Sequence, residues 1–157
     1  GRHHPARRFS AVRYPRRVTT AATDRFDSLA EHAPVGIVSS DERGTITYEL
    51  SYSGFTTEVR QAHIHIGRRA LNGGIMVWLC QTATNVDPTG LSPICPQQSG
   101  TVSGVIQDVN VIGPSVQGVT PGAFQALVDA IRADAAYVNV HSVAYPCGEL
   151  RGQLRDD

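Results

Sequence analysis

The chain has 157 residues, of which 41% are hydrophobic and 18% are charged, and its formal net charge is zero. This length fits one domain with an additional segment, and a net charge of zero gives no electrostatic reason to expect nucleic acid as a partner. No run of about 18 apolar residues occurs, so the sequence predicts no membrane-spanning helix.

Residues 1–33 are predicted to form an extended arm that precedes a domain at residues 34–157. Six arginines and no acidic residue occur before Asp24, and apolar periodicity is weak. Arginine suits contacts to carboxylates because its planar fork binds them bidentately. We therefore expect the arm to dock on another protein subunit, with peripheral membrane association as an alternative. The expected docking residues are Arg7, Arg8, Arg13, Arg16 and Arg17.

From Pro34 onward, short runs of alternating apolar and polar residues predict β-strands. Residues 37–39 and 45–52 flank a Ser-Asp-Glu-Arg-Gly turn and are predicted to form a hairpin. Further strands are expected at residues 59–66, 75–80, 100–107, 136–141 and 149–155.

One helix is predicted at residues 121–132. Thr120 is a suitable N-cap and Pro121 suits the first helical position. Apolar residues then recur at spacings of three and four, at Phe124, Leu127, Val128 and Ile131. The chain is therefore expected to be all-β, an antiparallel Greek-key β-sandwich of about seven to eight strands with one short helix and the N-terminal arm.

The three cysteines are Cys80, Cys95 and Cys147. Cys80 ends one apolar run and Cys95 stands just before the next strand, so a disulfide would close the intervening loop at its base. Two unrelated thiols are the alternative. The disulfide would leave Cys147 single and indicates an oxidising, extracytoplasmic compartment, either secreted, periplasmic or an organelle lumen such as the thylakoid lumen.

The segment Gln61-Ala62-His63-Ile64-His65-Ile66-Gly67 could hold a metal ion. In a strand, side chains alternate between faces, so His63 and His65 share one face and Ile64 and Ile66 the other. Neutral imidazoles are good ligands of copper and zinc.

A third histidine, His141, could join this pair if its strand lies beside theirs. Alternation places Tyr137 and Asn139 on the same face as His141, and the intervening valines toward the core. This polar row is expected to face outward, with Glu149 and Arg151 as an ion pair or as support for the metal ligands. Alternatively, hydrogen bonds alone could satisfy these polar side chains, with no ion.

Motifs for other chemistry are absent from the sequence. It contains no G-x-S-x-G nucleophile motif, and Gly73-Gly74 lacks the lysine of a phosphate-binding loop. The sequence therefore predicts a protein that is not an enzyme.

Several motifs resemble the CHRD domain, the module named after chordin. These are HIHIG, SGTVSGVIQ, AYVNVHS and GELRGQL, together with the loop between Cys80 and Cys95 and the helix that begins at Pro-Gly. The resemblance covers approximately residues 35–154, and Cys147 departs from the glycine that is usual there. It implies an all-β secreted module with no established catalytic reaction.

His-x-His on one strand and a lone histidine on a later one are also similar to the copper-binding pattern of copper/zinc superoxide dismutases. No histidine lies between His65 and His141 to complete a bridged two-metal site. The sequence therefore does not predict dismutase activity.

The resulting prediction is a non-enzymatic extracytoplasmic binding or structural module, an accessory subunit docked in a larger assembly through its arm and exposed sheet face. No cofactor is required by this interpretation. The alternative is a small metalloprotein that binds one copper or zinc ion through His63, His65 and His141.

Overall fold

The computed structural model describes residues 7–12, 35–40 and 44–156, and the side chains of residues 44–154. The described part of the chain contains one α-helix, α1 (Phe124–Arg132), and two short 3-10 helices, η1 (Asp108–Asn110) and η2 (Ser115–Gln117). It also contains eight strands: β1 (Arg7–Val12), β2 (Val35–Ser40), β3 (Ile46–Tyr52), β4 (Val59–Ile66), β5 (Ile75–Cys80), β6 (Gly100–Ile106), β7 (Ala136–Ser142) and β8 (Leu150–Asp156). No helix in this part is both long and apolar enough to cross a membrane.

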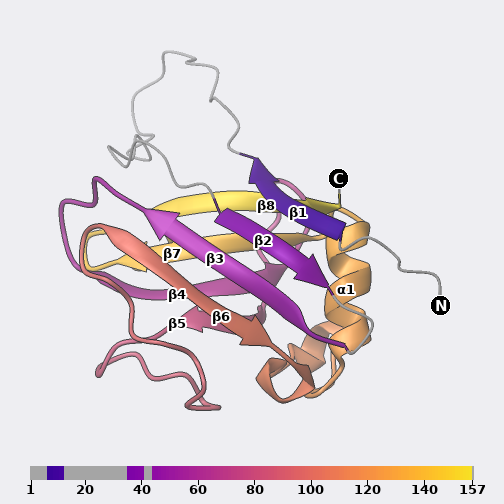
Figure 1. The fold of residues 1–157 in the computed structure, drawn as a ribbon. Helices are drawn as coiled ribbons and strands as arrows, with labels where there is room; N and C mark the ends of the chain where they lie inside the picture. The colour runs from indigo at the N-terminus through magenta and orange to yellow at the C-terminus, as the bar shows by residue number, and fades with distance from the viewer. Residues whose placement is uncertain (1–6, 13–34, 41–43, 157) are drawn as a thin grey trace.

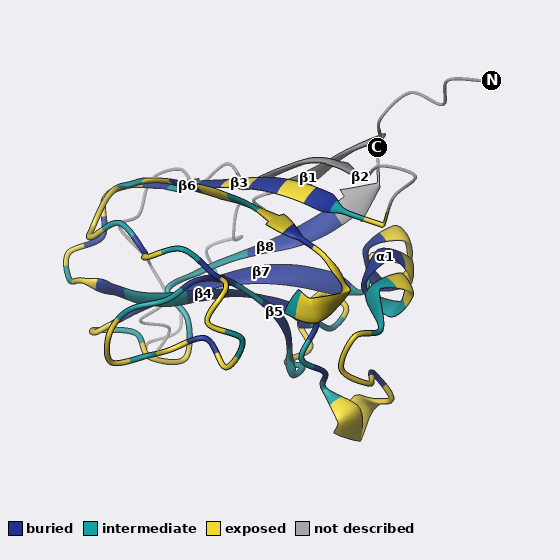
Figure 2. Cartoon of the chain, turned by 60° about the horizontal axis from the view of Figure 1, so that its bottom comes forward, coloured by how far each residue is buried: buried dark blue, intermediate teal, exposed yellow. Residues whose placement is uncertain are grey.

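The strands pair antiparallel in the order β5-β4-β7-β8-β1-β2-β3-β6. This sheet folds over into two layers, with β4, β5, β7 and β8 in one and β3 and β6 in the other (Figure 1, Figure 2). β6 lies beside β3, and β7 beside β4, so the connections cross between layers as in a Greek key. The predicted all-β sandwich is confirmed.

The core lies between the two layers, and the alternation of β3 shows how the sequence builds it. Ile46, Tyr48, Leu50 and Tyr52 are buried, whereas Thr47 and the other outward-facing residues of this strand are exposed or half-buried. The Tyr48 hydroxyl donates a hydrogen bond of 2.7 Å to the Leu79 carbonyl of the opposite layer. This layer therefore has one buried face and one face toward solvent, as antiparallel sheets commonly do.

The helix begins later than the sequence predicted. Helix α1 starts at Phe124, after Ala123, and its N-cap has no side-chain hydrogen bond. Gly122 adopts a φ of 83°, in the left-handed region, so the backbone at Pro121 cannot continue into a right-handed helix. The predicted cap at Thr120 is therefore wrong, although the predicted buried face is correct: Leu127, Val128 and Ile131 are buried.

Part of the predicted arm belongs to the sheet of its own domain. Arg7–Val12 forms β1, which pairs with β2 on one side and β8 on the other. We had expected this segment, with Arg7 and Arg8, to lie on a partner. The backbone N–H and C=O groups of β2 and β8 would otherwise be open at this seam, and β1 pairs with them. Arg13, Arg16 and Arg17 lie outside the described residues, so the division of the chain at residue 33 stays a prediction.

Candidate metal centre

Two neighbouring strands bring the three histidines together. In the antiparallel pairing of β4 with β7, His63 lies opposite Asn139, His65 opposite Tyr137, and Gln61 opposite His141. Residues opposite each other in a sheet place their side chains on the same face. Alternation therefore brings His63, His65 and His141 to one face, as expected, because the two strands are adjacent.

The ring nitrogens of these histidines are close enough to share one ion. One ligand atom from each residue lies within 4.8 Å of the other two. Ligands bonded to copper or zinc at about 2.0–2.1 Å are at most roughly 4 Å apart, so ring movements of less than about 1 Å would complete the site. In the described part of the chain, this is the one group of three or more His, Cys, Asp or Glu residues with such spacing.

Hydrogen bonds to backbone carbonyls determine which ring nitrogen of His65 and of His141 carries no hydrogen. Nδ1 of His65 lies 2.9 Å from the Gly73 carbonyl oxygen, and Nδ1 of His141 lies 2.9 Å from that of Pro146. A carbonyl can only accept, so both Nδ1 atoms carry the hydrogen and both Nε2 atoms carry a lone pair. Carbonyl groups orient metal-binding histidines in this way in many proteins.

His63 is placed differently from the other two. Its Nδ1 lies 3.2 Å from Nε2 of His141. Because that Nε2 has no hydrogen, Nδ1 of His63 must be the donor in the metal-free protein. If His63 held an ion through Nδ1, it would lose this hydrogen bond and would carry its hydrogen on Nε2.

Two nitrogens of the cluster are buried without any hydrogen-bond partner: Nε2 of His63 and Nε2 of His65. A cluster stabilised by hydrogen bonds alone would leave few such atoms, because an unsatisfied buried polar group costs about 1–3 kcal/mol. Among the described residues, the lone pair on Nε2 of His65 has no hydrogen-bond partner, so a metal ion could accept it. The residues present therefore fit a copper or zinc ion.

Burial keeps the rings neutral. It lowers the pKa of His63 to about 2, and any proton on the nearby rings of His141 or His65 would lower this pKa further by repulsion. Burial also lowers the pKa of His65 and of His141, against the opposing effect of the Gly73 and Pro146 carbonyls. Neutral imidazole is the form that binds metals.

The polar face does not point toward solvent, contrary to our expectation. His63 is fully buried, and His65 and His141 are 8% and 7% exposed. The connection between β4 and β5 supplies the Gly73 carbonyl, and the turn between β7 and β8 supplies that of Pro146, so both connections fold back toward the histidines. The strand β7 is dark blue in Figure 2, and all seven of its residues are buried.

The predicted supporting residues have separate roles. The Asn139 side chain donates to the Cys147 carbonyl at 3.3 Å. Oε2 of Glu149 is buried without a partner. The Arg151 guanidinium binds the β4–β5 connection and lies over Tyr137. The alternative of a Glu149–Arg151 ion pair is therefore not the arrangement found.

Sequence reasoning missed Gly73, Pro146 and Trp78. A Cβ atom on Gly73 would lie 1.5 Å from the Ile66 carbonyl oxygen, so only glycine fits there. The Trp78 ring contacts His63 edge to face, with centroids 4.3 Å apart. The adjacent glycines Gly73-Gly74 were a signal of close backbone approach, whereas nothing local distinguishes Pro146.

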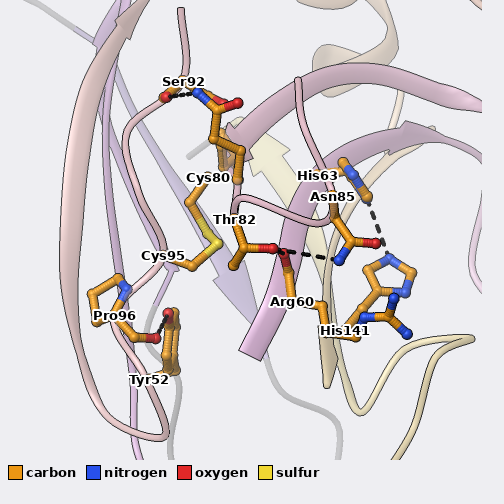
Figure 3. The surroundings of a disulfide bond; sticks show 12 residues. Tyr52, Arg60, His63, Cys80, Thr82, Asn85, Ser92, Cys95, Pro96 and His141 are labelled. Atoms are coloured by element: carbon orange, nitrogen blue, oxygen red, sulfur yellow. Dashed lines mark hydrogen bonds between the residues drawn. A yellow bond between two sulfur atoms is a disulfide. The ribbon is translucent and has the colours of Figure 1, made fainter. Parts of the chain in front are cut away.

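The predicted disulfide is confirmed. Cys80 and Cys95 are bonded, with Cα atoms 4.9 Å apart (Figure 3). Cys147 is a free, exposed thiol. Figure 3 also shows the hydrogen bond between His63 and His141. The closed loop is held further by the buried Asp87 carboxylate, which accepts from the backbone N–H groups of Thr89 and Ser92.

Comparison with known proteins gives one match. The family model described as the CHRD domain matches residues 32–154 of the chain. Domains of this type are extracellular, non-catalytic binding modules, which agrees with the disulfide. Among curated proteins none matches the chain significantly, and the same holds among solved structures.

Proposed function

Since the chain belongs to the CHRD domain family, we propose that it is a non-enzymatic extracytoplasmic binding module whose ligand is one copper or zinc ion held by His63, His65 and His141. Family membership supports the binding role and the compartment. The ion is supported by the geometry of the cluster.

The observation that carries this proposal is the buried lone pair on Nε2 of His65. It lacks a hydrogen-bond partner, and His65 is one of three histidines that each offer one ligand atom within 4.8 Å of the other two. Three neutral imidazoles suit copper and zinc better than magnesium or calcium, which prefer oxygen ligands. A bound ion would supply a charged, Lewis-acidic centre, and the surrounding carbonyls would hold the rings for it.

The test is a titration of chelator-treated protein with Zn²⁺ and, separately, with Cu²⁺. We expect one ion per chain, and at an ion concentration one hundred times Kd a gain of about 2.7 kcal/mol in the free energy of unfolding. His65→Ala should weaken binding at least about 100-fold because it removes one of three ligands.

The control variant is His32→Ala, which removes a histidine other than the three proposed ligands. Binding that is equally strong in His65→Ala and in the control would show that the ion binds elsewhere. Failure of the intact protein to bind either ion would refute the proposal.

A further inference from the structure

A stack of three flat groups lies against one side of the candidate metal centre. The Arg151 guanidinium carbon is 3.4 Å from the centroid of the Tyr137 ring. The Tyr137 ring in turn stacks on His65, with centroids 4.9 Å apart and planes within 9° of parallel. Cation–π attraction and ring stacking thus connect Arg151 to one of the three histidines.

Arg151 also holds the connection between β4 and β5. Its guanidinium donates to the carbonyl oxygens of Leu71, at 2.7 Å, and Arg68, at 3.2 Å, and to Oδ1 of Asn72, at 3.2 Å. Three acceptors around one planar group suit the fork of arginine, whereas the single ammonium of lysine could not reach all of them in the same geometry.

The same connection determines the state of His65. Its Gly73 carbonyl accepts the Nδ1 hydrogen of His65, and the Gly73 N–H donates to the Tyr137 hydroxyl at 3.2 Å. Arg151 therefore reaches His65 by two routes, through the stacked Tyr137 ring and through the backbone of the connection at residues 67–74. Arg151 itself is not one of the ligand residues.

We infer that Arg151 is the positioning residue of the histidine cluster: by holding Tyr137 and the β4–β5 connection, it keeps His65 in the Nδ1–H form with Nε2 free for an ion. That Arg151 keeps His65 in the Nδ1–H form follows from the contacts seen in the metal-free protein. The consequence for metal affinity rests on the proposed function.

The first measurement uses metal-free protein at pH 7.5. The Nδ1 proton of His65 should be observable by ¹H–¹⁵N NMR, because it is buried and hydrogen-bonded. In Arg151→Gln we expect its exchange with solvent to quicken at least about tenfold, since the Gly73 carbonyl is no longer held in place. Arg132→Gln, which removes an exposed arginine at the end of α1 that is not part of the stack, should match the original protein.

The second measurement is the Zn²⁺ affinity of the same proteins. Loss of groups that orient metal ligands typically weakens binding about 10- to 100-fold, and we expect Arg151→Gln to fall in this range. Arg151→Lys keeps the charge but loses the fork, so it should recover only part of the affinity. If Arg151→Gln does not fold, Arg151→Lys carries both measurements.

The outcomes separate the two proposals. Exchange and affinity both within twofold of the original protein would overturn the role of Arg151, as would weaker affinity with unchanged exchange at His65. Faster exchange with no Zn²⁺ binding in any of the proteins would support the role of Arg151 and overturn the proposed metal function.

Discussion

His63 is fully buried, and its environment opposes a positive charge. Burial and the neighbouring histidines lower its pKa from the ordinary value of 6.5 to about 2. In the unfolded chain the same ring takes up a proton near pH 6.5. Between these two values the unfolded state binds more protons than the folded state, so protons favour unfolding in that range.

The metal-free protein should therefore lose stability as the pH falls below about 6.5. For each histidine the loss is up to about 1.4 kcal/mol per pH unit, whereas above about pH 7 this contribution is fully present and constant. His65 and His141 should also make the protein less stable as the pH falls, because burial lowers their pKa values too. Urea unfolding at pH 7.5, 6.0 and 5.0 measures the slope.

The matched variant for this experiment is His63→Asn. The asparagine amide can donate to Nε2 of His141 in place of Nδ1, and it does not titrate. Between pH 6 and pH 5, the variant should reduce the slope of unfolding free energy against pH by the equivalent of about one proton, or about 1.4 kcal/mol per pH unit. A slope equal to that of the original protein would mean that groups other than His63 cause the loss.

At the scale of single elements, the local sequence pattern predicted where most of the strands lie. It did not predict which connections fold over the histidine-bearing strands. The strands β4 and β5 have the predicted bounds, because both are continuous runs of apolar or alternating residues that end at polar or glycine-containing segments. The orientation of the His65 and His141 rings depends instead on the Gly73 and Pro146 carbonyl groups, in the connections that follow their strands. Backbone carbonyls are common to all residues, so no sequence pattern marks the ones that accept these hydrogen bonds.

The helix shows a similar limit. Its apolar spacing predicted the buried face correctly, but the Thr-Pro-Gly sequence before it predicted a start at Pro121, which is too early. The positive φ of Gly122 places the start at Phe124. The resemblance to the CHRD domain, by contrast, correctly indicated the family because it used motifs spread over the whole domain.

The disulfide should stabilise the domain measurably. On the chain-entropy model, closing a loop of about 15 residues stabilises the folded state by roughly 3 kcal/mol. Replacing both Cys80 and Cys95 by serine should lower the free energy of unfolding by about this amount, as measured by urea denaturation at pH 7.5. Cys147→Ser is the control, because its thiol is free and exposed. Equal stability of the double variant and the control would mean that the loop stays ordered without the bond.

At the scale of the whole molecule, β1 joins the two layers. It pairs with three residues of β2 and four of β8, seven cross-strand pairs in all. A chain that begins at Arg13 lacks these pairs and should lose about 3.5 kcal/mol of unfolding free energy, at roughly 0.5 kcal/mol for each pair. It should also self-associate, because β2 and β8 would have open edges.

The control for this truncation is a chain that begins at Arg7 and so keeps β1. Analytical ultracentrifugation and urea denaturation of the two chains test both parts of the prediction. A chain beginning at Arg13 that is monomeric and as stable as the control would mean that the segment is dispensable for the domain.

Every residue of β7 is buried, and this strand pairs along both of its edges, with β4 and with β8. Opening the seam at β1 breaks no pair of β7 with β4, so the molecule could come apart there while the two histidine-bearing strands stay closed. The slowest amide protons of the protein should then be those of β7 and β4, released only when the entire domain unfolds. A bound ion would be retained through every smaller fluctuation, with a dissociation rate governed by the unfolding of the domain.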